Sequence, residues 1–162
     1  MAKDVPQQAN EKCTREQLIK NLNEDLAREF QAIIAYVVYS QVLKGAENMH
    51  ISTELEKHAA QELSHALIVA KQIDYLGGTP TVTPKPVREA KSNKDMLRAD
   101  LNNENETVKN YRVRVRQCEQ LGEYAIAEIL RGILVNEQDH QIDLATALGV
   151  DIPDVTTEAE RT

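Results

Sequence analysis

The chain has 162 residues, a net charge of −7 and 28% charged side chains, a length that suits one domain with a buried core. Six aromatic residues, six Gly and five Pro leave a composition that favours helix over strand. The acidic balance argues against nucleic acid as the main partner. Without a run of about 18 apolar residues, no membrane span is expected.

The ends of the chain and its two cysteines bear on its location. The N-terminus is polar and has no apolar core of the kind found in signal peptides. Cys13 and Cys118 are too widely separated to form a zinc motif or a disulfide framework. We therefore expect a cytoplasmic protein whose thiols are reduced.

The first expected helix follows a polar segment, residues 1–13, that we interpret as a flexible tail. Thr14 and Gln17 have the spacing of a capping box, in which each side chain binds the backbone of the other residue. From this point we expect a helix to about residue 43, ended near Gly45.

The second expected helix starts at about residue 47 or 49 and ends at Gly77 and Gly78, near residue 76. Residues 79–91 contain three prolines and cannot be helical. Fully extended, these 13 residues span up to about 43 Å, about the length of a 28-residue helix. This segment can therefore cross a helical bundle from end to end.

The second half of the chain predicts another helical hairpin. A helix is expected over residues 92–121, broken by Gly122, and another over residues 123–148, ended by Gly149. We interpret residues 151–162 as an acidic, flexible tail. One short, one long and one short connection predict an all-α four-helix bundle over residues 14–150, with one crossover between the second and third helices.

Glu-x-x-His tetrapeptides are the clearest local motif. Residues 62–65 and residues 137–140 each place a carboxylate and an imidazole three positions apart, on one face of a helix. Both groups can then bind one metal ion. A third tetrapeptide, residues 47–50, has Gly122 and Ala125 at its matching positions in the second half, so we interpret it as a chance occurrence.

The second half of the chain repeats the first at a constant offset in numbering, which we call the internal repeat. The matching pairs are Glu29 and Glu104, Tyr36 and Tyr111, Glu62 and Glu137, and His65 and His140. Each helix then carries a stripe that is apolar at its ends and polar at its middle. Two hairpins related by a pseudo-two-fold axis would bring the four polar middles together.

This arrangement predicts a metal site rather than four solvated helix faces. Burying four carboxylates without compensation would be strongly unfavourable, whereas cations would neutralise them. A set of four carboxylates and two imidazoles, with one imidazole per ion, suits a pair of iron or manganese ions better than zinc. Two of the glutamates can bridge ions that lie roughly 3.5–4 Å apart in two-metal sites.

The pattern resembles the ferritin-like superfamily, specifically its bacterioferritin branch, over residues 17–150. The local sequences of residues 96–101 and 128–131 are similar as well. The resemblance implies a ferroxidase with two iron ions per subunit, for which manganese or zinc can substitute in crystals. It implies oxidation of Fe(II) by oxygen or hydrogen peroxide and storage in a hollow homo-oligomer. The implied ligands are Glu29, Glu62, His65, Glu104, Glu137 and His140, with Glu62 and Glu137 bridging. The resemblance also implies Tyr36 as an electron donor, and core packing with its hydroxyl bonded to a glutamate is the alternative.

Three departures from the branch matter. Leu63 occupies the position of the haem-ligating Met, so no haem is expected. Lys57 and Gln61 replace the His and Asp of an inner-surface iron site, which we expect to be absent. No clear counterpart of the family's fifth helix follows Gly149, so a 12-subunit shell is credible beside a 24-subunit one.

Other side chains receive plainer interpretations. We expect Tyr111 to pack in the core with its hydroxyl bonded to a glutamate. His58 is a stray core or surface imidazole, with an accessory iron ligand as the alternative. Cys118 is read as a small buried hydrophobe, Cys13 as a tail thiol, and His50 as a surface residue.

Three other functions remain open. One is a Dps-like protein that protects against peroxide, which shell size and oxidant preference would distinguish. A second is a di-iron oxygenase or peroxidase with an organic substrate or a redox partner. This second function is less favoured, because Thr107 stands where such proteins carry an additional Glu near the third-helix ligand and the sequence has no Cys-x-x-Cys. A third is a metal-free structural bundle, whose handling of iron would not depend on the two Glu-x-x-His motifs.

Overall fold

The computed structural model describes residues 13–156. These residues form four long helices and no strand. The outermost parts of both expected tails, residues 1–12 and 157–162, lie outside the described residues. The elements are α1 (Arg15–Val42), a 3₁₀ turn (Ala46–Asn48), α2 (Met49–Tyr75), α3 (Asn93–Gln120) and α4 (Tyr124–Leu148). The all-α fold is therefore confirmed. In this part of the chain, no helix combines the length and apolar character needed to cross a membrane.

The helices begin and end where the sequence predicts. The Thr14 hydroxyl accepts a hydrogen bond from the Gln17 backbone N–H at 3.2 Å, and the Gln17 side chain accepts one from the Thr14 N–H at 2.8 Å. Ser92 caps α3 by accepting from the Asp95 N–H at 3.1 Å. Gly149 ends α4 with a φ of 64°, in the left-handed region that suits glycine.

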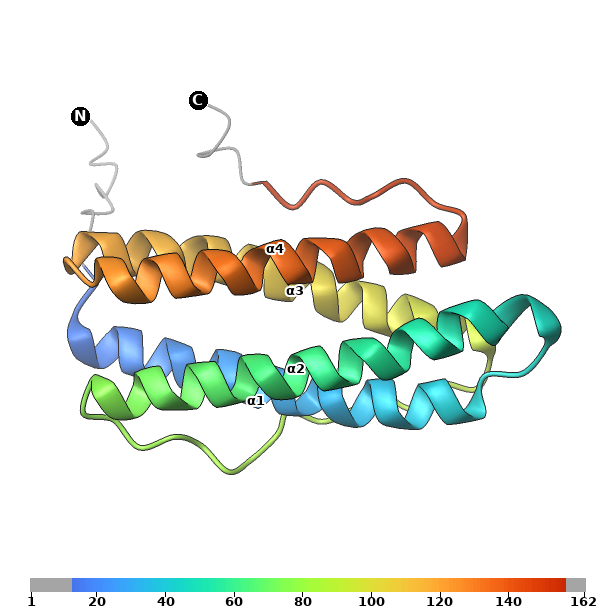
Figure 1. The fold of residues 1–162 in the computed structure, drawn as a ribbon, viewed down its shortest axis with the longest axis horizontal. Helices are drawn as coiled ribbons and strands as arrows, with labels where there is room; N and C mark the ends of the chain where they lie inside the picture. The colour runs from blue at the N-terminus through green and yellow to red at the C-terminus, as the bar shows by residue number, and fades with distance from the viewer. Residues whose placement is uncertain (1–12, 157–162) are drawn as a thin grey trace, which may run out of the picture.

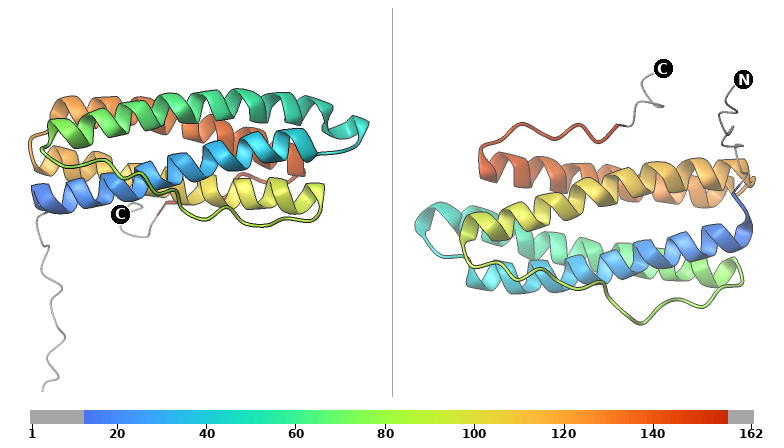
Figure 2. Two further views of the ribbon diagram at one scale, coloured as in Figure 1. Left: turned by 90° about the horizontal axis from the view of Figure 1, so that it is seen from below. Right: turned by 180° about the vertical axis from the view of Figure 1, so that it is seen from behind.

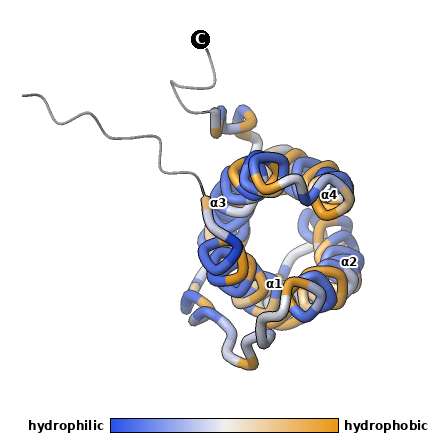
Figure 3. Tube along the Cα trace, turned by 90° about the vertical axis from the view of Figure 1, so that its left-hand side faces the viewer, coloured by the Kyte–Doolittle hydropathy of each residue, from blue (hydrophilic) through white to orange (hydrophobic). Residues whose placement is uncertain are grey.

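The bundle consists of two antiparallel hairpins, α1 with α2 and α3 with α4 (Figure 1). Seen along its axis, the four helices surround a common centre (Figure 3). The segment between α2 and α3 runs along α1 (Figure 2). Its contacts follow α1 in order: Thr81 N–H donates to Asn23, Lys85 N–H to the Ala27 carbonyl at 2.9 Å, and the Tyr39 hydroxyl to the Arg88 carbonyl.

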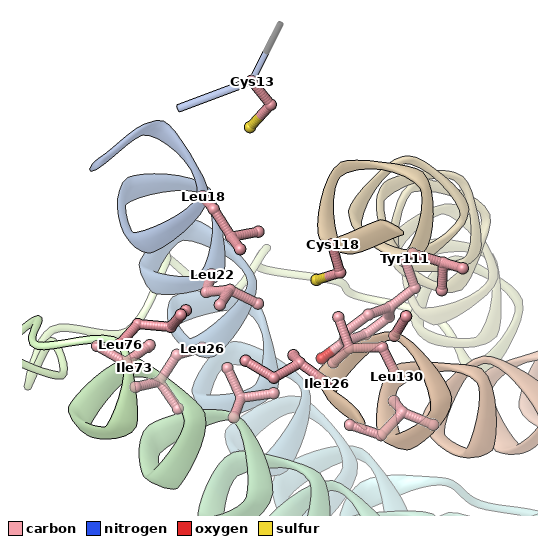
Figure 4. Close-up of a cluster of buried hydrophobic side chains, with 14 of the residues drawn as sticks. Cys13, Leu18, Leu22, Leu26, Ile73, Leu76, Tyr111, Cys118, Ile126 and Leu130 are labelled. Atoms are coloured by element: carbon pink, nitrogen blue, oxygen red, sulfur yellow. The ribbon is translucent and has the colours of Figure 1, made fainter. Parts of the chain in front are cut away.

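Two apolar clusters occupy the ends of the bundle and leave its middle to polar groups. One gathers leucine, isoleucine and valine side chains from α1, α2, α3 and α4 around Leu22 and Cys118 (Figure 4). The other lies at the opposite end around Leu55 and Leu97. The stripes expected from the sequence are thus apolar at their ends, and the middle of the bundle is where the candidate ligands lie.

Cys13 differs from its expected role as a tail thiol. Its side chain is 9% exposed and belongs to the same cluster as Leu18 (Figure 4). Cys13 immediately precedes the cap residue Thr14, and Leu18 is four residues inside the helix end. This is the spacing of a hydrophobic staple, in which the residue before the cap packs on the first turn. The expectation was wrong because the residue directly before a helix cap packs on the first turn of the helix and is buried there.

A buried ion pair links the two hairpins near the candidate ligands. Arg114 Nε donates to Asp25 Oδ2 at 2.7 Å and its Nη2 donates to Oδ1 at 3.3 Å. Asp25 is 2% exposed and Arg114 is 8% exposed. Burial raises the pKa of Asp25 to about 6, although the charge of Arg114 opposes the shift. The sequence pattern gave no indication of this pair.

Replacing Arg114 with Met should destabilise the fold by about 3–5 kcal/mol near pH 7, because it leaves a buried carboxylate unpaired. Above the unfolded pKa of 3.8, the folded chain keeps the Asp25 proton that the unfolded chain has lost, up to a pH of about 6. Stability therefore falls as pH rises through this window. Without Arg114 the pKa of Asp25 rises further, so the variant goes on losing stability above pH 6 and its deficit should be smaller at pH 5 than at pH 7. Denaturant unfolding at pH 5 and 7 measures this, with exposed Lys109→Met as the control. An equal deficit at both values would contradict it.

Candidate metal centre

The six predicted ligands lie together at the middle of the bundle. Each helix of a hairpin contributes either one glutamate or one Glu-x-x-His pair, and every one of the six residues is at most 3% exposed. The contributing residues are Glu29 on α1, Glu62 and His65 on α2, Glu104 on α3, and Glu137 and His140 on α4. Helical spacing of three residues points each Glu-x-x-His pair toward the same interior point.

The central carboxylates each present one oxygen to each imidazole. Nδ1 of His65 lies 3.1 Å from Glu62 Oε2 and 3.1 Å from Glu137 Oε1. Nδ1 of His140 lies 2.9 Å from Glu62 Oε1 and 3.2 Å from Glu137 Oε2. Both carboxylates therefore span the two halves of the site, as bridging ligands of a metal pair do.

The outer carboxylates complete two ligand sets. Glu29 Oε2 lies 3.6 Å from His65 Nδ1, and Glu104 Oε1 lies 4.0 Å from His140 Nδ1. Within each set of four residues, one ligand atom per residue lies within 4.8 Å of the others. The two sets share Glu62 and Glu137, and each adds a terminal carboxylate and an imidazole: Glu29 with His65, and Glu104 with His140.

The polar atoms of the site fit metal ions better than they fit one another. Several carboxylate oxygens lie close to an imidazole nitrogen but lack the alignment that a hydrogen bond requires. Buried polar atoms without a hydrogen bond are rare in proteins. The atoms without a hydrogen bond are Glu29 Oε2, Glu62 Oε1, Glu104 Oε2, both carboxylate oxygens of Glu137, and His140 Nδ1. Two divalent cations would neutralise four carboxylates and supply these atoms with partners.

When metal is absent, bound protons offset the negative charge of the four carboxylates. Burial, together with the charge of Glu137, raises the pKa of both Glu62 and Glu104 well above the usual range. Burial alone would lower the pKa of His65, but the surrounding carboxylates outweigh burial and raise this pKa. The same balance raises the pKa of His140. At Glu137, burial favours a higher pKa, but the hydrogen bonds and charges of the two imidazoles outweigh burial and lower the pKa to about 2.

The two buried tyrosines bind glutamates of the opposite hairpin. The Tyr36 hydroxyl donates to Glu104 and the Tyr111 hydroxyl donates to Glu29. The pseudo-two-fold relation exchanges these two contacts, since the internal repeat pairs the two tyrosines with each other and the two glutamates with each other. Burial raises the pKa of both hydroxyls, so both remain protonated donors. The expected bond from Tyr111 to a glutamate is thus present, across the bundle.

Two amide side chains, which the sequence analysis missed as partners of the site, hold the imidazoles from behind. His140 Nε2 lies 2.8 Å from Gln61 Oε1, and His65 Nε2 lies 3.3 Å from Asn136 Oδ1. An amide oxygen only accepts, so each Nε2 carries the proton and Nδ1 is left for a metal. Gln61 and Asn136 immediately precede Glu62 and Glu137 and so match under the internal repeat, which is the signal that could have identified them.

Gln61→Leu or Asn136→Leu should weaken metal binding at the centre by roughly 10- to 100-fold, because the imidazole loses the acceptor that orients it. Competition titration with Co(II) measures the affinity. Gln138→Leu provides a control, since Gln138 is an exposed residue of α4. Equal affinities in the three variants would show that these amides do not orient the imidazoles.

The other candidate residues lie outside this centre. His58 is in the core, 2% exposed, with its ring stacked on that of His140 at a centroid distance of 4.0 Å. Leu63 lies on α2 and is 53% exposed. His50 is on the surface, as expected, near the start of α2.

Comparisons with known proteins agree with this geometry. Residues 19–151 match the ferritin family, described as a ferritin-like domain. A bacterial ferritin from Synechocystis sp. PCC 6803 is 30% identical over 137 residues, covering 82% of this chain and 86% of its own. A bacterioferritin from Brucella melitensis is 25% identical, with 82% and 86% covered. The crystal structure of a ferritin-like, diiron-carboxylate protein from Bacillus anthracis Ames has a TM-score of 0.80 and 34% identity, with 83% and 96% covered.

Proposed function

This chain belongs to the ferritin-like domain family, in its bacterioferritin-like branch, and on that premise we propose that it is a ferroxidase. It oxidises Fe(II) to Fe(III) at a di-iron site held within one subunit. The observation that carries the proposal is the pair of buried carboxylates, Glu62 and Glu137, each of which presents one oxygen to each half of the site. The diiron-carboxylate description of the Bacillus anthracis neighbour supports iron as the metal.

The side chains of this centre bind two Fe(II) ions and release protons as they do so. Glu62 and Glu104 are the carboxyls whose raised pKa keeps a proton in the metal-free site. When bound, the two ions supply one electron each, which together reduce oxygen to hydrogen peroxide or hydrogen peroxide to water, with two protons consumed. Protons displaced from the ligands by iron are therefore available at the place where the oxidant is reduced.

We propose that Tyr36 acts as an additional electron donor, and two of its contacts support this role. Its hydroxyl binds Glu104, and its ring lies edge-on to that of His140 at a centroid distance of 6.1 Å. A phenol that loses an electron also loses its proton, and the Glu104 carboxylate is positioned to accept that proton. Tyr111 has the matching bond to Glu29 but lacks the ring contacts that Tyr36 makes with His58 and His140.

Burial of the centre favours small reactants over an organic substrate. All six ligands are at most 3% exposed, which suits ions, oxygen and hydrogen peroxide. We propose no haem, because Leu63 offers no ligand atom where the family's haem methionine stands. We also propose that the chain works in the cytoplasm, in a hollow homo-oligomer of 12 or 24 subunits that stores or detoxifies iron.

Anaerobic loading followed by exposure to oxidant tests the proposal. Fe(II) is added to the metal-free protein, iron per chain is measured, and oxidation is followed by stopped-flow absorbance with oxygen or hydrogen peroxide. We expect a fast phase that accounts for two iron ions per chain. Absence of a fast phase with either oxidant would refute a ferroxidase. The particle mass in solution distinguishes a 12-subunit from a 24-subunit shell, and the faster oxidant distinguishes a protective from a storage role.

A further inference from the structure

A second polar cluster lies beside the metal centre, on α2 and α4. It consists of Glu54, His58 and Asp143, which we call the outer triad. One ligand atom from each of the three lies within 4.8 Å of the others. His58 Nε2 is 3.1 Å from Asp143 Oδ2. The His58 side chain is buried, and its Nδ1 has no hydrogen-bond partner.

The outer triad connects the protein surface to the metal centre. A surface cavity of about 180 Å³ is lined by Glu54 and Asp143, and also by the exposed residues Glu47 and His50. Behind these carboxylates lies His58, whose ring stacks on His140 at a centroid distance of 4.0 Å. A cation in the cavity would therefore meet two carboxylates first and then an imidazole that touches a ligand of the centre.

The outer triad breaks the internal repeat in a specific way. The ligands, the tyrosines and the two amides all have chemically similar counterparts in the other half of the chain. The three members of the outer triad have isoleucine at every corresponding position: Ile129 for Glu54, Ile133 for His58, and Ile68 for Asp143. Ile133 is buried in the apolar cluster at the other end of the bundle, with Ile68 packed against it. One side of the metal centre thus carries apolar side chains, of which Ile133 is buried and Ile129 is 38% exposed, and the opposite side carries potential ligands.

From this asymmetry and the open cavity, we propose that Glu54, His58 and Asp143 bind a third divalent cation. The site offers two carboxylates, one of which, Glu54, also pairs with the exposed Lys57 at 2.7 Å. A nitrogen–oxygen ligand set suits Fe(II), Mn(II), Co(II) or Zn(II). The functional role of this third cation site rests on the proposed ferroxidase function. In that role the outer triad holds incoming Fe(II) at the edge of the centre and supplies it to the two inner positions.

Crystals grown with Co(II) test binding directly through anomalous scattering. The test variant is Glu54→Gln/Asp143→Asn, which keeps side-chain size and removes two charges. The matched control is Glu56→Gln/Glu128→Gln, which removes two charges from exposed residues of the same two helices. We expect a peak between the three side chains in the wild type and the control and no peak there in the test variant. Absence of that peak in the wild type, or its persistence in the test variant, would overturn the proposal. Peaks at the two inner positions report separately on the ferroxidase centre.

Oxidation kinetics test the supply role. In the Glu54→Gln/Asp143→Asn variant, the Fe(II) concentration that gives half-maximal rate should rise by about tenfold, the effect of losing charge-assisted ligands, while the maximal rate stays unchanged. The control variant should match the wild type in both. An unchanged half-saturating concentration in the test variant would refute the supply role, whereas loss of the fast phase in the wild type would refute the ferroxidase itself.

Discussion

The double variant Glu62→Ala/Glu137→Ala should lose rapid Fe(II) oxidation while its helices remain folded. These two carboxylates are shared by both ligand sets, so their removal weakens both metal positions at once. Loss of a partner behind a ligand already lowers metal affinity or activity by 10- to 100-fold, so loss of both shared ligands should lower the oxidation rate by about 100-fold or more. Stopped-flow absorbance measures the rate, and far-ultraviolet circular dichroism measures helix content.

The same double variant should fold, because it removes charge from a crowded site. Glu62 and Glu137 are buried, and Glu62 Oε1 and both carboxylate oxygens of Glu137 have no hydrogen-bond partner. Relief of that crowding offsets part of the cavity that the shortened side chains leave. Glu56→Ala/Glu128→Ala, two exposed glutamates on the same helices, should oxidise Fe(II) at the wild-type rate. A folded Glu62→Ala/Glu137→Ala variant with wild-type kinetics would rule out the proposed site.

Metal loading should raise the thermal stability of the wild type by about 10–20 °C. Each ion present at 100 times its dissociation constant stabilises the folded state by about 2.7 kcal/mol, and each kcal/mol raises the Tm of a chain of this length by about 2–4 °C. Redox-inert Zn(II) is a suitable probe in scanning calorimetry at pH 7.5. In Glu62→Ala/Glu137→Ala most of the increase should be absent.

This increase in Tm should become smaller as pH falls. The metal-free folded chain holds protons on groups whose pKa is raised, among them Glu62, Glu104 and His65. Metal must displace these protons, so a lower pH favours the metal-free state and a higher pH favours the loaded one. The Zn(II)-dependent increase should therefore be smaller at pH 5 than at pH 7.5. An increase that does not depend on pH would show that the ions bind groups that carry no proton.

Most of the fold and the grouping of the six candidate ligands follow from patterns along the chain. Heptad-like spacing of Leu22, Glu29 and Tyr36 fixes which residues share one helix face, and the internal repeat identifies their counterparts. Turn residues such as Gly149 mark the helix ends to within a residue or two. These signals suffice because an α-helix converts sequence spacing directly into a face.

Contacts between hairpins could not be predicted in the same way. Periodicity gives the face of each helix, but the residue opposite depends on how far one hairpin is shifted along the other. For that reason the sequence predicted a glutamate partner for Tyr111 without identifying Glu29, and it missed the pair of Asp25 and Arg114. The sequence leaves the role of His58 open, because its contacts with Asp143 and with the ring of His140 depend on how α2 packs against α4.

The crosswise bonds of Tyr36 to Glu104 and of Tyr111 to Glu29 have a consequence for the history of the chain. Each hairpin supplies half of a symmetric site and completes the half of the other, as two identical subunits would. A single ancestral hairpin could therefore have formed the same centre by pairing with its own copy. Gene duplication would then have fused the copies through the crossover, and only afterwards could Glu54, His58 and Asp143 come to differ from the isoleucines at the corresponding positions.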